Sequence, residues 1–201
     1  KVKVYSGDKK IVTKNFYCKK IISCVTKMDA LYWTVCQNYM KSLLDSVTVQ
    51  SLHHIYAKKT PKKLDSSKRK FPENALQQVI KPTHDKEWFQ VSYSSGRISS
   101  FWNRIELKYG NEFVKKITQQ YSNIPLEKVE TYHWTNAYHM WVPVPEFDFE
   151  KAVGGSIEPN RIHLPDFYWA GECFSSHQGW AEGALETADM VLKCYFRNWH
   201  Y

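Results

Sequence analysis

Alternating and clustered apolar positions predict strands at the start of the chain. Residues 2–5 alternate between polar and apolar types, and an extended pattern resumes over 11–17 after a turn at 6–8. The apolar run at 21–25 is typical of a buried strand. This order of strand, turn, strand and buried strand predicts a meander.

Helical and extended patterns alternate through the rest of the chain. Large apolar side chains recur at helical spacing over 97–109 and again over 112–121, with Gly110 and Asn111 between them. Because sheet and helix alternate without a strict βαβ period, we predict an α/β fold of mixed, α+β type. The other segments expected are one or two short helices in 28–46, a helix at 73–79, a loop or short helix at 148–155, a helix at about 180–196, strands at 47–56, 88–93 and 129–134, and an extended stretch at 141–145.

Length and cysteine content limit the class of protein. A chain of 201 residues with 43% apolar residues can bury the core of about one domain, or parts of two. No stretch approaches the ~20 apolar residues that a membrane span needs, so we expect no membrane partner. The cysteine spacings fit neither a zinc site nor a disulfide framework, which favours a reducing, cytoplasmic setting and no metal. The five cysteines are Cys18, Cys24, Cys36, Cys173 and Cys194.

The positive charge is concentrated in one segment. The formal net charge is +8, a balance that can favour nucleic acid or another anionic partner. Seven Lys and Arg residues crowd residues 58–70, beside Pro61, Asp65 and two serines. Such runs are usually solvated loops, so we expect an exposed loop and no nucleic acid, with an anion-binding patch as the alternative.

The densest pattern of the chain lies between Tyr168 and Ala188. Aromatic residues that suit a strand lead into the small-residue turn Ala170-Gly171-Glu172, and a polar loop then leads into Gly179-Trp180-Ala181-Glu182-Gly183-Ala184. Small residues at a strand-to-helix turn let a backbone approach a flat ligand closely. A Gly-Glu pair followed by Gly-aromatic-x-Glu-Gly-Ala resembles the C-terminal flavin-binding motif of the FAD-dependent amine oxidase family, which includes monoamine, polyamine and L-amino-acid oxidases.

The resemblance implies FAD as the cofactor and assigns residues to it. Glu172, in the turn with Ala170 and Gly171, would lie beside the ribityl and pyrophosphate part of FAD, where a carboxylate accepts hydrogen bonds from sugar hydroxyls. The helix that starts at Gly179, Trp180 and Ala181 would point its N-terminal N–H groups, which carry about half a positive charge, at the flavin. Gly183 would allow close packing of that helix. An ordinary surface acid and an ordinary amphipathic helix are the alternatives.

Three residues are candidates for contact with the substrate. By resemblance, Trp180 would form one wall of an aromatic cage that guides an amine through the ring quadrupole, and Trp141 would form the opposite wall. Core packing is the alternative for both rings. Many family members place a lysine just after a strand of the substrate domain, where it holds a water molecule near the flavin, and Lys58 follows a predicted strand in the same way. A lysine in a dry pocket could act in proton transfer. The alternative is a solvated lysine at the start of the basic loop.

The chain lacks one expected feature. No Gly-x-Gly-x-x-Gly run, which the family uses to bind the FAD pyrophosphate, occurs in the sequence. We therefore expect the chain to be the C-terminal part of a longer flavoprotein, which alone holds FAD weakly or not at all. The expected domains are a meander and strand of a Rossmann-like FAD-binding domain at 1–27, a substrate domain with a mixed sheet and helices on one face at 28–150, and a C-terminal FAD-binding segment at 151–201.

Two functions follow from these observations. The favoured one is part of an FAD-dependent oxidoreductase of the amine oxidase family, which oxidises a C–N bond of a small-molecule substrate, an amine, by hydride transfer to flavin and reoxidation by oxygen. The alternative is a truncated or divergent non-catalytic module that binds an anionic partner in a salt-sensitive manner.

Overall fold

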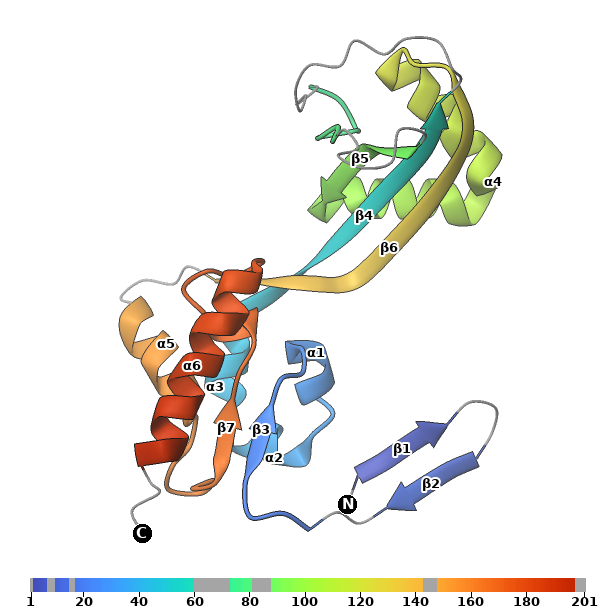
Figure 1. Ribbon diagram of the computed structural model, residues 1–201. Coiled ribbons are helices and arrows are strands. Elements are labelled where there is room, and N and C mark those ends of the chain that lie inside the picture. The colour runs from blue at the N-terminus through green and yellow to red at the C-terminus, as the bar shows by residue number, and fades with distance from the viewer. Residues whose placement is uncertain are drawn as a thin grey trace. The chain divides into compact units, whose positions relative to one another are not determined.

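The structure is a computed structural model of the 201-residue chain (Figure 1). It describes residues 2–6, 10–14, 17–59, 73–80, 88–142 and 148–197. These residues divide into two compact units. Unit 1 combines both ends of the chain, Lys1–Ser46 and Pro143–Tyr201, and unit 2 is the continuous segment Val47–Val142.

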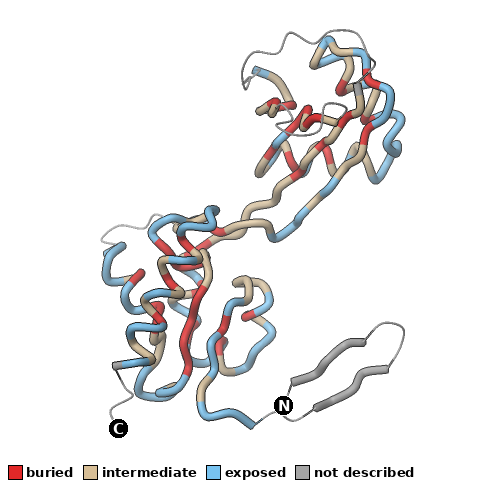
Figure 2. Tube along the Cα trace, viewed as in Figure 1, coloured by how far each residue is buried: buried red, intermediate tan, exposed pale blue. Residues whose placement is uncertain are grey.

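Unit 2 is an antiparallel sheet with a long helix against one face. Strand β4 (Val47–Lys59) is central and pairs with β5 (Trp88–Ser95) on one side and β6 (Leu126–Trp141) on the other. Helix α4 (Gly96–Ser122) packs against the sheet. The shared core includes Ile55, Val91, Trp102 and Val114, and Figure 2 shows buried positions along the strands and helix of this unit. Alternation along each strand therefore sends one set of side chains to the helix and leaves the other set on the open face.

Helix α4 contains the interruption that the sequence predicts. Gly110 has φ 74° and ψ 176°, which is not helical, so two helical segments meet there. Only glycine adopts this backbone conformation without strain. The second segment ends at Asn123 (φ 54°), whose N–H bonds to the carbonyl oxygen of Gln119. The prediction of helices at 97–109 and 112–121 is confirmed.

The predicted helix at 73–79 is wrong. Residues 73–76 form a bend followed by a turn, residues 77–78 have no regular structure, and Ile80 makes an antiparallel bridge with Gln90 of β5. The Asn74 side chain accepts a hydrogen bond from the backbone N–H of Leu76, and Gln77 has a left-handed φ of 53°. Local side-chain bonding of this kind competes with a helix, and Ser92 fixes the turn by donating to the carbonyl of Leu76.

Unit 1 contains a short parallel pair of strands, with helices packed beside one of them. Strand β3 (Ile21–Ser23) pairs in parallel with β7 (Phe167–Trp169), which lies near the other end of the chain. The predicted meander is therefore corrected, because β3 pairs with β7 and not with the hairpin formed by β1 (Val2–Ser6) and β2 (Lys10–Lys14). The Gly7-Asp8 turn of that hairpin lies outside the described residues. The helices of unit 1 are α1 (Lys27–Ala30), α2 (Thr34–Tyr39), α3 (Lys41–Asp45), α5 (Phe149–Ile157), α6 (Ala181–Arg197) and the 3-10 turn η1 (Glu172–Phe174).

The segment 28–46 lies in unit 1, whereas we expected it to belong to the substrate domain at 28–150. Tyr39 stacks on His163 with ring centroids 5.0 Å apart, and the Asn160 side chain donates to the carbonyl of Tyr39. Ala30, Cys36, Met40 and Leu44 are buried. Short helices cannot bury their apolar side alone, so their partners decide the unit to which they belong, and those partners are far away in sequence.

The α/β fold class predicted from the sequence is confirmed, with parallel strands in unit 1 and antiparallel strands in unit 2. All three described strands of unit 2 are antiparallel, although a mixed sheet was expected there. None of the described helices is long and apolar enough to cross a membrane. The lysine-rich segment after Lys59 and the proline-rich segment at 143–147 lie outside the described residues.

Candidate functional site

The turn after β7 is fixed by one threonine of α6. Ala170 continues the strand pairing by donating its N–H to the carbonyl of Ser23, 2.8 Å away. Gly171 follows with a left-handed φ of 115°. Its N–H donates to Thr187 Oγ1 at 2.9 Å, and the threonine hydroxyl lies 3.0 Å from the carbonyl oxygen of Gly171. The buried hydroxyl of Thr187 thus contacts both the backbone N–H and the carbonyl oxygen of Gly171. At this left-handed φ, any residue other than glycine would be strained.

Glu172 closes the polar loop that follows. Its Oε2 accepts a hydrogen bond of 2.8 Å from the N–H of Gly179, which itself has a left-handed φ of 78°. This bond joins the start of η1 to the residues just before α6 across seven positions. The sequence pattern assigned Glu172 to the cofactor, and the structure places its carboxylate in a contact that shapes the loop.

Gly183 lies where the same loop crosses α6. A Cβ atom at this position would lie 2.9 Å from the carbonyl carbon of His177 and closer still to that carbonyl oxygen and to Ser175 Oγ. The helix and loop are therefore in van der Waals contact without room for a methyl group. The loop is also tied to α6 by Ser176, whose hydroxyl donates to the Glu186 carboxylate. That hydrogen bond lowers the pKa of Glu186.

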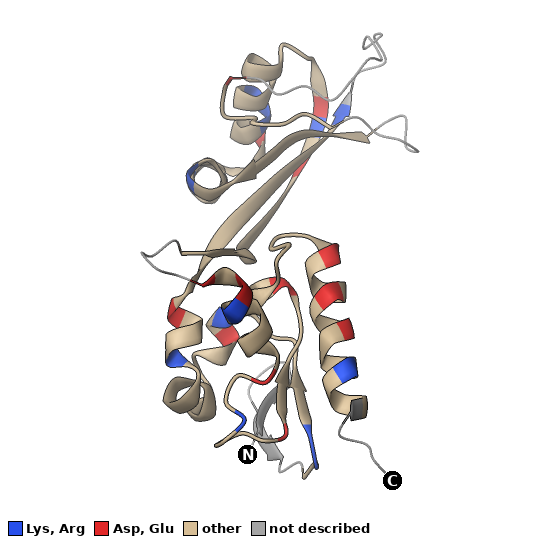
Figure 3. Ribbon diagram, turned by 90° about the vertical axis from the view of Figure 1, so that its left-hand side faces the viewer, with Lys and Arg blue, Asp and Glu red and all other residues tan. Residues whose placement is uncertain are grey.

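Trp180 and Ala181 lie at the exposed beginning of α6. The Trp180 side chain is 69% exposed. Acidic residues gather in the first half of the helix (Glu182, Glu186 and Asp189) and Lys193 follows (Figure 3). This order suits the helix dipole. The loop between β7 and α6 thus brings together five of the predicted cofactor residues: Ala170, Gly171, Glu172, Gly179 and Gly183. Trp180 and Ala181 lie next to it, at the start of α6.

Trp141 and Lys58 belong to unit 2, not to this loop. Trp141 is the last residue of β6 and pairs with Val47 at the start of β4. Lys58 lies near the end of β4, in register with Trp88 on one neighbouring strand and Lys128 on the other. Its Nζ is 3.5 Å from Glu127 Oε1, and its side chain is 31% exposed. An ion-paired, partly exposed ammonium differs from the lysine in a dry pocket that the family resemblance suggested.

The sulfur and imidazole groups do not extend the site. Cys173 is buried in η1, and desolvation raises the pKa of its thiol far above the usual value. His53 is buried and bonds to Glu106 (3.1 Å), whereas His54 lies on the opposite side of the strand beside Tyr93 and Trp134. Within the described ranges, no three His, Cys, Asp or Glu side chains come together as metal ligands.

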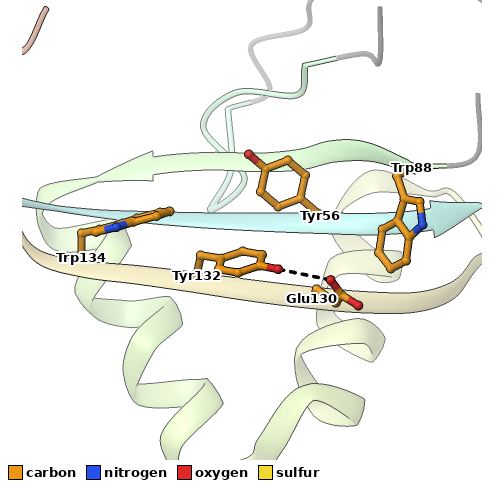
Figure 4. A pocket seen from close by; sticks show the side chains of 5 residues that line it. All are labelled: Tyr56, Trp88, Glu130, Tyr132 and Trp134. Carbon is orange, nitrogen blue, oxygen red and sulfur yellow. Dashed lines mark hydrogen bonds between the residues drawn. The ribbon is translucent and has the colours of Figure 1, made fainter. Parts of the chain in front are cut away.

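Sequence reasoning missed two features. Thr187 fixes the turn from 16 residues away, and no local pattern in the sequence marks it. The open face of the unit 2 sheet also carries an aromatic groove lined by Tyr56, Trp88, Glu130, Tyr132 and Trp134 (Figure 4). The alternation of Tyr132 and Trp134 in a predicted strand was a usable signal, because alternate residues share a face.

Comparison with known proteins supports the fold alone. No protein-family model matches the chain, and no curated protein matches it. The chain is similar to the crystal structure of a protein described as a putative protoporphyrinogen oxidase from Exiguobacterium sp. 255-15, with a TM-score of 0.60 and 9% sequence identity. The match covers 90% of this chain and 42% of that one. The chain therefore spans less than half the length of its structural neighbour.

Proposed function

We propose that this chain forms the C-terminal flavin segment and the substrate-binding unit of an FAD-dependent oxidoreductase that oxidises a carbon–nitrogen bond. The observation that carries the proposal is the loop from Ala170 to Gly183, in which two left-handed glycines and a carboxylate precede the start of a helix. The likeness in fold to a protein described as an oxidase supports it.

The loop fits a flat, polar cofactor. Among the described residues other than its own chain neighbours, none places a heavy atom within 4 Å of the position that a Cβ of Gly171 would occupy, so the backbone at this turn is open to a ligand. The exposed ring of Trp180 lies next to the start of α6, where helix N–H groups carry partial positive charge. In our proposal the segments 170–172 and 179–183 would hold FAD. When bound, FAD supplies the hydride acceptance and the reoxidation by oxygen.

In this proposal, the residues of the chain would position the cofactor and the substrate rather than take part in the redox reaction themselves. Thr187 and Glu172 hold the loop in one conformation, which removes the entropy cost of ordering it when a ligand binds. Gly183 lets α6 approach the loop closely, so the start of the helix stays fixed relative to the turn. Trp141 remains our candidate for contact with the substrate from unit 2. Lys58 lies eleven residues further along β4 than Val47, the partner of Trp141, and so is about 36 Å away at about 3.3 Å per residue, which means that the same small molecule cannot contact both.

We also propose that a further polypeptide region completes the FAD site. The described parallel sheet has only two strands, and parallel sheets normally have both faces covered by other elements. Ile21 and Ile22 of β3 are 45% and 47% exposed. An additional region that supplies the Gly-rich motif and more parallel strands would cover them.

The test is flavin retention. The purified chain is incubated with FAD, desalted and examined by visible spectroscopy, alone and co-expressed with the upstream region of its gene. A flavin band seen only with the upstream region supports both proposals. Retention by the chain alone overturns the need for a further region, and a colourless protein in both cases overturns the flavin proposal and favours a non-catalytic module.

A matched pair of variants sharpens this test. In the protein co-expressed with the upstream region, Glu172→Ala removes the carboxylate that closes the loop and should reduce flavin retention by about tenfold or more, because a hydrogen bond to a charged group contributes about 1.5–3 kcal/mol. Glu150→Ala changes an exposed acid in the first turn of α5 and should leave retention unchanged. Equal retention by the two variants would contradict the role given to the loop.

A further inference from the structure

The aromatic groove of unit 2 has the size and lining of a small-molecule site. It has a volume of about 520 Å³ and lies on the sheet face opposite the buried core. Pockets of about 300–1,000 Å³ commonly hold small ligands. Four aromatic rings and one carboxylate line it, all of them from the three strands (Figure 4).

The rings are ordered relative to one another. Tyr132 and Trp134 are adjacent on one face of β6, with centroids 6.2 Å apart and planes inclined by 23°. Tyr56 of β4 meets Tyr132 edge to face, with centroids 5.8 Å apart. Tyr132 and Trp134 are 46% and 44% exposed. The groove therefore presents large, electron-rich ring surfaces to solvent, which attract cations.

The groove already holds one ammonium group from the chain itself. Lys128 Nζ lies 2.7 Å from Glu130 Oε1 and 5.6 Å from the centroid of the Trp88 ring. Tyr132 donates a hydrogen bond to Glu130 Oε2. The hydrogen bond from Lys128 lowers the pKa of Glu130, so this carboxyl is ionised at neutral pH. The Lys128 side chain is 60% exposed and flexible enough to leave.

We propose that this groove binds a small organic ammonium ion, which takes the place of the Lys128 ammonium between Glu130 and the rings of Trp88, Tyr132 and Trp134. The carboxylate supplies charge, and the ring faces supply cation–π attraction to N-methyl or N-methylene groups. The inference rests on unit 2 alone and is independent of flavin binding. The two proposals therefore fail separately, one by loss of cation binding and the other by loss of flavin retention.

The experiment uses choline as the probe and the full chain labelled with 15N at tryptophan. Indole N–H resonances of Trp88 and Trp134 are assigned with Trp→Phe variants and followed during titration. The uncharged carbon analogue 3,3-dimethylbutan-1-ol has the same shape as choline and serves as the control ligand. We expect both resonances to shift with choline, with a dissociation constant on the order of millimolar, and to shift much less with the alcohol.

Two substitutions change binding in opposite directions. Lys128→Met removes the competing ammonium and should tighten choline binding by about 2- to 5-fold, whereas Glu130→Gln should weaken it by about the same factor. Trp134→Leu should weaken it by about 2- to 5-fold as well. Matched controls on α4 are Glu112→Gln, whose side chain is 85% exposed, and Tyr109→Leu, whose side chain is 50% exposed. Neither control should change the affinity.

Three outcomes would overturn the proposal. They are the absence of shifts at tens of millimolar choline, equal shifts with the uncharged alcohol, and weaker rather than tighter binding by Lys128→Met. The remaining indole resonances report folding of each variant, so loss of binding in a folded Glu130→Gln protein counts as evidence for the carboxylate.

Discussion

Gly183→Ala tests the close contact between the loop and α6. In a helix interior, alanine is normally more stable than glycine by about 0.5–1 kcal/mol. At this position, the new methyl group would overlap the backbone carbonyl of His177 and the hydroxyl of Ser175. Backbone cannot yield as the end of a flexible side chain can, so the loop must shift.

The expected size follows from two terms. Overpacking a methyl group into a closed site costs about 1–3 kcal/mol. A shifted loop also loses part of the Glu172–Gly179 hydrogen bond, which contributes about 1.5–3 kcal/mol because the acceptor is charged. The helix propensity gained offsets only part of this. We expect Gly183→Ala to destabilise the loop and the first turns of α6 by about 1–3 kcal/mol.

Gly154→Ala is the matched control. Gly154 also lies within a helix of unit 1. Apart from the backbone of that helix and the two chain neighbours, no heavy atom of the described residues lies within 4 Å of the position that its Cβ would occupy. There the propensity term acts alone, so this variant should be stabilised by about 0.5–1 kcal/mol. The two glycine-to-alanine changes should thus have opposite signs.

Hydrogen–deuterium exchange resolves the two sites in one protein. For Gly183→Ala we expect amides between Glu172 and Thr187 to exchange about 5- to 150-fold faster, which corresponds to about 1–3 kcal/mol. For Gly154→Ala, amides of α5 should exchange more slowly. If Gly183→Ala slows exchange as Gly154→Ala does, the tight crossing of the loop and helix does not exist.

Three further perturbations address other parts of the chain. Thr187→Val should destabilise unit 1 by about 1–3 kcal/mol in urea denaturation, because it leaves the N–H of Gly171 without its partner; Thr187→Ser should restore most of the loss, and an equal loss in both would point to packing instead. Gly110→Ala should destabilise unit 2 by about 1–3 kcal/mol, because a residue with a Cβ is strained at φ 74°; unchanged stability would mean that the kink can be absorbed. Desolvation lowers the pKa of buried His53, so the stability gained by keeping it neutral is complete above about pH 6.5 and is lost as pH falls toward the folded-state pKa. The free energy of unfolding, measured by denaturation at about pH 7.5 and pH 5.5, should therefore change less with pH in His53→Gln than in the original protein. An identical change in both proteins would contradict the assignment.

Local patterns in the sequence predicted most elements of the fold. The spacing of Phe101, Trp102 and Ile105 and the interruption at Gly110 were enough to predict two helical segments, because helix periodicity and glycine conformation are local properties. The helix predicted at 73–79 does not form, because the Asn74 side chain accepts a hydrogen bond from the backbone N–H of Leu76 and Ile80 joins a strand that is adjacent only in the folded chain. The assignment of 28–46 differed for a similar reason, since its partners are more than a hundred residues away.

The candidate site was predicted in its residues and not in its contacts. The motif from Ala170 to Gly183 identified the loop, since glycines and a carboxylate at those spacings are visible in the sequence. The structure added that Glu172 bonds to Gly179 and that Thr187 holds Gly171. Neither contact follows from spacing, because each depends on how α6 packs on the loop.

The sequence by itself determined where the chain turns, where helices are interrupted and which face of each strand is apolar, because these depend on a few neighbouring residues. The tertiary structure decided that β3 pairs with β7, that the two ends of the chain form one unit, and that four aromatic rings and Glu130 line one groove. The physical reason is that pairing between distant segments depends on the burial and hydrogen bonding of the whole fold, which no short window of sequence contains.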